Sequence, residues 1–322
     1  MLKEIAKNIY LNEIDLPKSP LKYLNSYIIK SPERSLVIDT GFNRPECEEK
    51  FFAGLDELGI DLKKTDVLVT HLHSDHCGLM APLAEKGATI LMGEKESESI
   101  MAFENDAYWS KFKHHAHMYG ADGENLDITE HPGYKFRPLP IKTFKPLNEG
   151  DILQYADYSL EVLNVPGHTK GHIALYEKGQ GLLFCGDLIL DKITPTITFW
   201  GFEQDILQVY MDTLKRIGKL DIRKVLTGHR ALLSDFNKRA DELVKHHEKR
   251  LGEIIGIISH GEKTVCQTAA LMSWDITAKT WDDFPRAQKW FAIGEAMSHL
   301  DHLYCTGRAN REERDGILYY SK

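Results

Sequence analysis

The chain has 322 residues, of which 42% are hydrophobic and 27% are charged, and its formal net charge at pH 7 is -8. These values are typical of a folded globular protein with one large domain and a small one. They give no general attraction for polyanions, which disfavours nucleic acid as a partner, and no stretch approaches the roughly 20 apolar residues of a membrane span. The first residues lack the apolar core of a signal peptide, and the five cysteines form no close pair. We therefore expect reduced thiols and a cytoplasmic protein.

The first part of the chain alternates between short apolar runs and segments with apolar residues at helical spacing. Strands are expected at 27–29, 35–39, 67–70 and 89–92, and helices at 46–58 and 78–86. This alternation predicts an α/β fold built of packed layers.

Four potential metal ligands, His71, His73, Asp75 and His76, lie within six positions directly after the strand expected at 67–70. Side chains alternate faces along a strand, so the first two histidines emerge on one side at its end, while Asp75 and His76 fall on the turn beyond. One short segment could therefore serve two metal ions. Imidazole and carboxylate ligands suit zinc, iron or manganese, and a site with few thiolates usually keeps an open position, which favours catalysis over a structural metal.

Three later segments repeat one pattern, in which a potential ligand follows an apolar run. His168 lies in the run Pro166–His172, Asp187 follows Leu182–Gly186, and His229 follows Val225–Gly228. Each ligand lies where the chain leaves a sheet, which is the usual place for functional groups on a rigid scaffold. Singly, each would be an ordinary loop residue, but together they predict a shared site.

Residues 95–147 form an insertion rich in aromatic side chains. One interpretation is a pair of helices packed on the domain, and the other is a lid that presents an apolar surface to substrate. Its histidines His114, His115 and His117 are expected to be solvated or hydrogen-bonded rather than to be further ligands.

The C-terminal part begins with a long amphipathic helix after the N-cap candidate Ser234-Asp235. A shorter helix through Leu271, a helix over 287–303 and a hairpin with its polar tip at 308–315 are expected to follow. Three helices and a hairpin resemble a winged helix, a module that often binds DNA. Residues 236–322, however, hold 13 Lys and Arg against 13 Asp and Glu, so the basic excess of a phosphate-binding module is missing. We expect a role in packing or in a homodimer.

Taken together, the motifs resemble those of the metallo-beta-lactamase-fold hydrolases, in the branch of glyoxalase II and the lactonases. The matching segments, in the family's order, are 36–41, 70–78, 166–172, 185–187 and 228–229. The resemblance implies a four-layer αββα sandwich over residues 1–235, with the metals at one edge and a winged-helix-like α+β domain over residues 236–322.

The same resemblance implies the ligands of two divalent ions, with zinc expected and iron or manganese left open. His71, His73 and His168 would bind the first ion, and Asp75, His76 and His229 the second, with Asp187 between them. Asp39 would orient a metal-bound histidine, and His172 would lie beside the ligands without being one.

The expected reaction is hydrolysis of a small thioester, ester or lactone by a metal-bound hydroxide, with Asp75 as the catalytic residue that orients the nucleophile or passes on a proton. The apolar insertion and the acidic chain favour a small-molecule substrate. Two alternatives remain: a ribonuclease or phosphodiesterase of the same fold, and a metal sensor without turnover that binds DNA or a partner.

Overall fold

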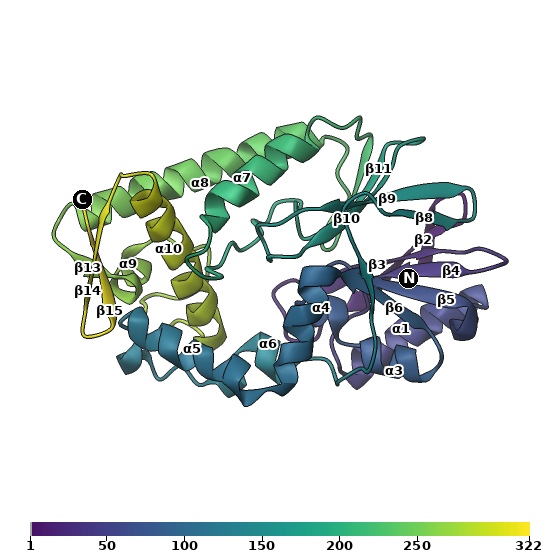
Figure 1. Ribbon diagram of the computed structural model, residues 1–322, viewed down its shortest axis with the longest axis horizontal. Coiled ribbons are helices and arrows are strands. Elements are labelled where there is room, and N and C mark those ends of the chain that lie inside the picture. Colours follow the sequence, from purple (N-terminus) through teal and green to yellow (C-terminus); the bar gives the residue numbers. More distant parts are fainter. Residues whose placement is uncertain (1) are drawn as a thin grey trace.

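The computed structural model describes residues 2–322 and contains two mixed sheets that pack face to face, with helices on both outer sides (Figure 1). The first sheet has the strand order β1-β2-β3-β4-β5-β6-β7, and the second has the order β12-β11-β10-β9-β8. A third, three-stranded sheet of order β13-β15-β14 belongs to the C-terminal part. The predicted α/β layers and the small C-terminal α+β part are confirmed.

Both sheets of the sandwich contain parallel as well as antiparallel pairs, and in the second sheet the parallel pair is β11 with β12. In the first sheet, β1 to β4 pair antiparallel and β4 to β7 pair parallel. These strands are β1 (Leu2–Ala6), β2 (Ile9–Asp15), β3 (Tyr23–Ile29), β4 (Ser35–Ile38), β5 (Thr65–Val69), β6 (Thr89–Gly93) and β7 (Lys145–Leu147). The second sheet comprises β8 (Ile152–Tyr155), β9 (Tyr158–Asn164), β10 (Ile173–Glu177), β11 (Leu182–Gly186) and β12 (Lys224–Thr227).

Alternation along the strands divides the hydrophobic core into layers. On β4, Leu36 and Ile38 face the core between the two sheets, whereas Val37 faces the core beneath the outer helices. Both faces of this strand are therefore buried, which explains why its sequence is apolar throughout instead of alternating with polar residues.

Helices cover the outer face of each sheet. The first sheet is covered by α1 (Pro45–Leu58) and α3 (Met80–Glu85), and the second by α7 (Ile206–Ile217) and α8 (Phe236–Ile258) (Figure 1). The expected N-cap of α8 is confirmed, because the Asp235 carboxylate accepts a hydrogen bond from the backbone N–H of Lys238. Within residues 2–322, no helix is both long enough and apolar enough to cross a membrane.

The insertion contains more and shorter elements than a simple helical pair. It comprises α4 (Glu94–Met101), α5 (Asp106–Met118), α6 (Pro132–Lys135) and the 3-10 turns Ala102–Glu104, Asp122–Glu124 and Ile128–Glu130. Its end, β7, adds a strand to the edge of the first sheet.

The C-terminal part consists of β13 (Lys263–Thr264), α9 (Val265–Leu271), α10 (Arg286–Cys305), β14 (Asn310–Arg314) and β15 (Ile317–Ser321). The hairpin was predicted with the wrong boundaries, because its tip is Asp315-Gly316 and most of the expected polar tip is the strand β14. Four of the five β14 residues are exposed, so no apolar alternation marks the strand. Both turn residues have positive φ, as a tight two-residue hairpin requires. The likeness to a winged helix stays a prediction.

A polar link joins the two sheets at the end opposite the ligands. Asp66 on β5 accepts hydrogen bonds from Arg34 Nε at 2.8 Å and from the Tyr155 hydroxyl on β8 at 2.6 Å. Burial raises the pKa of Asp66, but the hydrogen bonds from Arg34 and Tyr155 outweigh burial and hold the pKa below its usual range. The carboxylate therefore stays ionised and ties the sheets together.

Replacing this carboxylate should lower stability in a pH-dependent way. We expect Asp66→Asn to lose about 1–2 kcal/mol of unfolding free energy at pH 7, since charged hydrogen bonds are lost but Arg34 is partly exposed. The folded pKa is depressed, so this contribution is present above the unfolded pKa of about 3.9 and is lost as pH falls through the folded value. Urea unfolding at pH 7 and at pH 3 measures the difference in unfolding free energy between Asp66→Asn and the unchanged protein. A difference that does not shrink at pH 3 contradicts the prediction, and the exposed Asp56→Asn is the control.

Candidate metal centre

The seven predicted ligands converge at one edge of the sandwich, at the ends of strands from both sheets. His71, His73, Asp75 and His76 follow β5, and the last two lie on the short helix α2 (Ser74–Cys77). His168 follows β9, Asp187 follows β11, and His229 follows β12. Neighbouring strands end at the same edge, so segments far apart in the sequence meet there.

Among residues 2–322, three overlapping groups of three side chains bring their ligand atoms within 4.8 Å of one another, and two of these groups share no residue. The first group consists of His71, His73 and His168. The second consists of Asp75, His76 and His229, in which His229 Nε2 lies 3.2 Å from Asp75 Oδ2. The third group consists of His71, His76 and Asp187. The first two groups are the sets that the sequence resemblance implied, although their assignment to two ions stays a prediction.

Asp187 lies between the two groups. Its Oδ2 is 3.8 Å from His168 Nε2 in the first group and 3.5 Å from His229 Nε2 in the second. Its Oδ1 is 3.5 Å from His76 Nε2. One carboxylate therefore faces both groups, which is the position of a bridging ligand.

Hydrogen bonds on the outer side of the rings direct Nε2 of several histidines inward. His168 Nδ1 lies 2.8 Å from the carbonyl oxygen of Thr196, and His229 Nδ1 lies 2.7 Å from that of Tyr23. A carbonyl can only accept, so both Nδ1 atoms carry the proton and donate. Their Nε2 atoms are then left with the lone pair that a metal needs.

Asp39 contacts His76 directly and His71 through Thr70, at the Nδ1 atom of each ring. Its carboxylate lies 2.8 Å from His76 Nδ1 and accepts from the Thr70 hydroxyl, which in turn lies 3.0 Å from His71 Nδ1. Asp39 itself has a positive φ of 62°, a conformation that aspartate tolerates better than most residues. The contacts of Asp39 thus reach both rings, while its role in orienting a metal-bound histidine stays a prediction.

The environment shifts the pKa of the histidines in opposite directions in the two groups. Burial lowers the pKa of His73 to about 3, and burial also lowers the pKa of His71 and His168, so the first group is neutral at pH 7. Burial alone would lower the pKa of His76 and His229 too, but the carboxylates around them outweigh burial and raise it.

The carboxylates of Asp75 and Asp187 are ionised because the neighbouring imidazoles stabilise their negative charge. Burial opposes ionisation, but His76 and His229 outweigh it and lower the pKa of Asp75 to about 2. The same neighbours, with His168, also lower the pKa of Asp187.

The donor set fits divalent metal ions. Within residues 2–322, His168 Nε2 and Asp187 Oδ1 are buried and have no hydrogen-bond partner, and such orphaned polar atoms are costly unless something binds them. Neutral imidazoles with anionic carboxylates are ligands for zinc, iron or manganese. His172 lies beside the centre, with its ring 4.7 Å from that of His71, and belongs to none of these groups of three.

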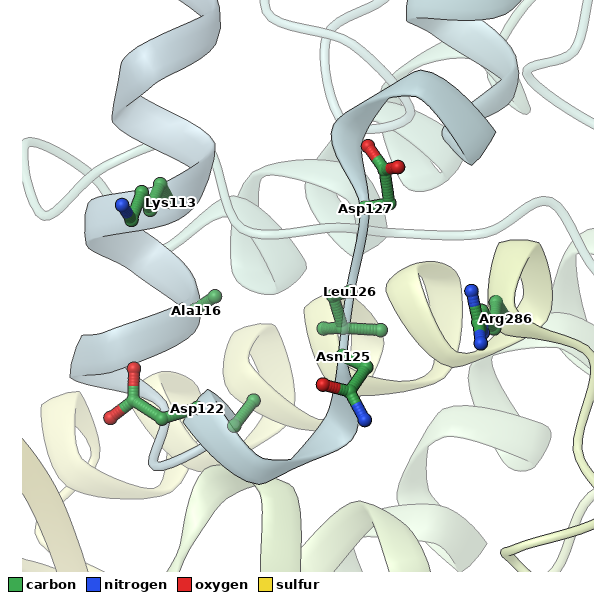
Figure 2. Close-up of a pocket in the computed structure, with 8 residues that line it drawn as sticks. Lys113, Ala116, Asp122, Asn125, Leu126, Asp127 and Arg286 are labelled. Carbon is green, nitrogen blue, oxygen red and sulfur yellow. The ribbon is translucent and has the colours of Figure 1, made fainter.

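The insertion is fastened to the C-terminal part instead of lying free over the centre. The carbonyl oxygen of Tyr119 accepts a hydrogen bond at 2.9 Å from the backbone N–H of Cys266, and His117 is hydrogen-bonded to Asp122 and to the backbone of Asp315. Residues of α5, of segment 121–127 and of the start of α10 line one cavity of about 520 Å³ (Figure 2). These contacts support the packed-helix interpretation of the insertion over a freely moving lid.

The segment after Asp187 is held by the C-terminal helices. Arg239 on α8 donates to the carbonyl oxygens of Leu190 and Ile193, and Ser298 on α10 donates to that of Ile197. This segment includes Thr196, whose carbonyl orients His168. The geometry of the first group therefore depends on side chains that come much later in the chain.

Two supporting residues carry no recognisable signal in the sequence. Thr196 acts through a contact that no motif marks, and Glu96 lies in a charged run that predicts an exposed helix face. Glu96 is nevertheless buried next to the segment that carries His168. Only the fold brings these residues to the site.

Comparison with known proteins agrees with this geometry. The family model described as the metallo-beta-lactamase superfamily matches residues 21–229, and that described as the metallo-beta-lactamase-like C-terminal domain matches residues 263–322. The chain therefore belongs to the metallo-beta-lactamase superfamily, and it is a hydrolase of that class.

Individual relatives are distant. A hydroxyacylglutathione hydrolase of Aeromonas hydrophila is 29% identical over 72% of this chain and 70% of its own. An acyl-coenzyme A thioesterase of Homo sapiens is 26% identical over 64% of this chain and 72% of its own. The crystal structure of a metallo-beta-lactamase family protein from Thermus thermophilus has a TM-score of 0.85 and 26% identity, covering 99% of this chain and 100% of that one.

Removing the charge of Asp39 should weaken metal binding without removing a ligand. We expect Asp39→Asn to lower metal affinity about 10- to 100-fold, the usual effect of losing a partner that orients a ligating histidine. Asparagine tolerates the same backbone conformation, so strain is not added. Competition with a chromophoric chelator measures the affinity. The matched control is Asp66→Asn, which removes a buried carboxylate far from the centre. Equal affinities for the two variants would contradict this role of Asp39.

Proposed function

We propose that the protein is a dinuclear-metal hydrolase that cleaves a small thioester. The observation that carries the proposal is the position of Asp187, whose one carboxylate faces imidazoles of both ligand groups within 3.8 Å. A shared carboxylate of this kind suits a pair of ions and not a single ion. Two of the relatives that this chain resembles are thioester hydrolases by name.

Each group has a defined part in holding the ions. His71, His73 and His168 would hold one ion, Asp75, His76 and His229 the other, and Asp187 would contact both. We expect zinc, with iron and manganese as the other candidates. When bound, such a pair lowers the pKa of water to near neutrality and polarises a carbonyl oxygen.

Asp75 is the residue best placed to move a proton. Its pKa of about 2 makes it anionic at neutral pH, and its Oδ2 lies 3.2 Å from His229 Nε2 at the centre. An anionic carboxylate here can accept a hydrogen bond from the attacking water and orient it towards the carbonyl carbon. A thiolate is a good leaving group, so cleavage of a thioester makes a small demand on the acid that protonates it.

An aromatic cluster in contact with the segment that carries His73 supports a substrate with an apolar part. The Ser74 hydroxyl, next to His73, donates to the carbonyl oxygen of Pro132 at 3.3 Å. The adjacent ring of His131 lies 5.1 Å from Phe112 and 5.8 Å from Phe291 of α10. The insertion and the C-terminal part thus both supply rings to an aromatic cluster that is joined to the ligand segment through Pro132 and Ser74. A cytoplasmic location and a homodimer stay predictions.

Loss of the shared carboxylate should remove metal and activity together. We expect Asp187→Ala to bind at most one ion where the unchanged protein binds two, and to lose more than about 100-fold in kcat/KM, because loss of outer partners alone costs about 10- to 100-fold. Elemental analysis and thioester turnover provide the measurements. Asp212→Ala, an exposed aspartate on α7, is the control. Full metal content in Asp187→Ala would refute the shared site.

The substrate class can be separated by a panel of thioesters, lactones, beta-lactams and phosphodiesters. We expect the highest kcat/KM for a thioester, complete loss after dialysis against a chelator, and recovery when zinc, iron or manganese is returned. Preferred cleavage of a phosphodiester, with activity that falls steeply as salt rises, would instead support the ribonuclease alternative.

A further inference from the structure

Glu96 is a carboxylic acid buried in the first turn of α4, with 1% of its surface exposed. Its neighbours on the same helix, Glu94 and Glu98, are exposed. Buried carboxyl groups are costly unless their oxygens are hydrogen-bonded. The hydrogen bonds of Glu96 must therefore offset the cost of burying its carboxyl group. No step of the proposed hydrolysis involves Glu96.

The carboxyl of Glu96 contacts the chain segment that carries His168, and its backbone belongs to the first sheet's side of the site. The Thr169 hydroxyl, one residue after His168, donates to Glu96 Oε1, and the backbone N–H of Gly171 donates to the same oxygen at 3.1 Å. Burial raises the pKa of Glu96 to about 7, while the hydrogen bonds from Thr169 and Gly171 oppose the rise. Glu96 itself lies on α4, which follows β6, and β6 pairs parallel with β5, the strand that leads to His71 and His73.

Two glycines allow α4 to approach this closely. A Cβ atom on Gly171 would lie 2.7 Å from the backbone nitrogen of Glu96, and one on Gly93 would lie 2.7 Å from the carbonyl oxygen of Gly171. Contacts of this length are not sustained by real Cβ atoms. The start of α4 is thus pressed against the segment after His168, which leaves the Glu96 carboxyl little freedom to move.

His71 and His73 follow a strand of the first sheet, whereas His168 follows a strand of the second. We propose that Glu96 is a positioning residue that holds these two segments in register and so fixes the three histidines of the first group relative to one another. Glu96 Oε2 has no hydrogen-bond partner within residues 2–322, so the link to the His168 segment runs through Oε1. The proposal rests on the metal centre described above and is independent of the substrate.

The test compares metal binding by the full-length protein carrying Glu96→Ala, Glu96→Gln and the exposed control Glu98→Ala. Zinc affinity is measured by competition with a chromophoric chelator, and the absorption spectrum of the cobalt-substituted protein reports ligand geometry. We expect Glu96→Ala to lose about 10- to 100-fold in affinity for one of two ions and to change the cobalt spectrum. Glu96→Gln keeps the acceptor oxygen and should stay within about threefold of the unchanged protein, as Glu98→Ala should.

A second substitution tests the same hydrogen bond from its other end. Thr169→Val removes the donor and should lower affinity like Glu96→Ala, and the double variant should lose little more than either single one. If Glu96→Ala does not fold, the metal affinity of Thr169→Val, which lacks the hydroxyl, is compared with that of Thr169→Ser, which keeps it.

The outcomes separate this inference from the proposed function. If the unchanged protein binds fewer than two ions, the dinuclear function fails. If it binds two, and Glu96→Ala or Thr169→Val binds them with unaltered affinity and spectrum, only the positioning role of Glu96 is overturned. Equal losses in Glu96→Gln and Glu96→Ala would also overturn it, because charge and not the hydrogen bond would then matter.

Discussion

The structure depends on one electrostatic constraint, the burial of many ionisable groups at a single edge of the sandwich. The carboxylates of Asp39, Asp75 and Asp187 are almost wholly removed from water, as are the imidazoles of the ligand groups except that of His73, which is half-buried. Such a cluster is stable only where opposite charges and hydrogen bonds compensate each group. The ends of strands from the two sheets provide that arrangement. Each ligand segment follows a buried strand, which is held in place by its hydrogen bonds to neighbouring strands. Two divalent ions would more than balance the three carboxylates.

The parts of the site that could be predicted from the sequence are those whose residues lie close together in the chain or directly follow a recognisable strand. His71 to His76 are close in the chain, and His168, Asp187 and His229 each follow a buried strand, so a layered α/β fold was enough to bring them together. The sequence could not predict Glu96, whose charged helix shows no apolar pattern that marks one glutamate as buried. It also misplaced the C-terminal hairpin, because β14 lies at a sheet edge and its polar residues face solvent.

The C-terminal part has a structural role that its composition alone did not reveal. From Glu295 to Leu303, every residue of α10 is buried, which is not the exposure of a helix that enters a DNA groove. Ser298 on this helix holds the segment that carries Thr196, and Trp290 and Phe291 meet rings of the insertion. The aromatic residues of α10 therefore contribute to packing within one molecule, and no dimer is needed to account for them.

One hydrophobic cluster runs without interruption from the second sheet through α7 and α8 into α9 and α10, joining residues such as Val165, Tyr210, Leu251 and Leu300. The two parts of the chain that the family models match therefore share one hydrophobic cluster. A chimera that exchanged the C-terminal segment for that of a relative would also exchange one wall of the catalytic core. Its ability to bind metal would depend on side-chain complementarity across the junction, so recombination between distant relatives is restricted at this point of the chain.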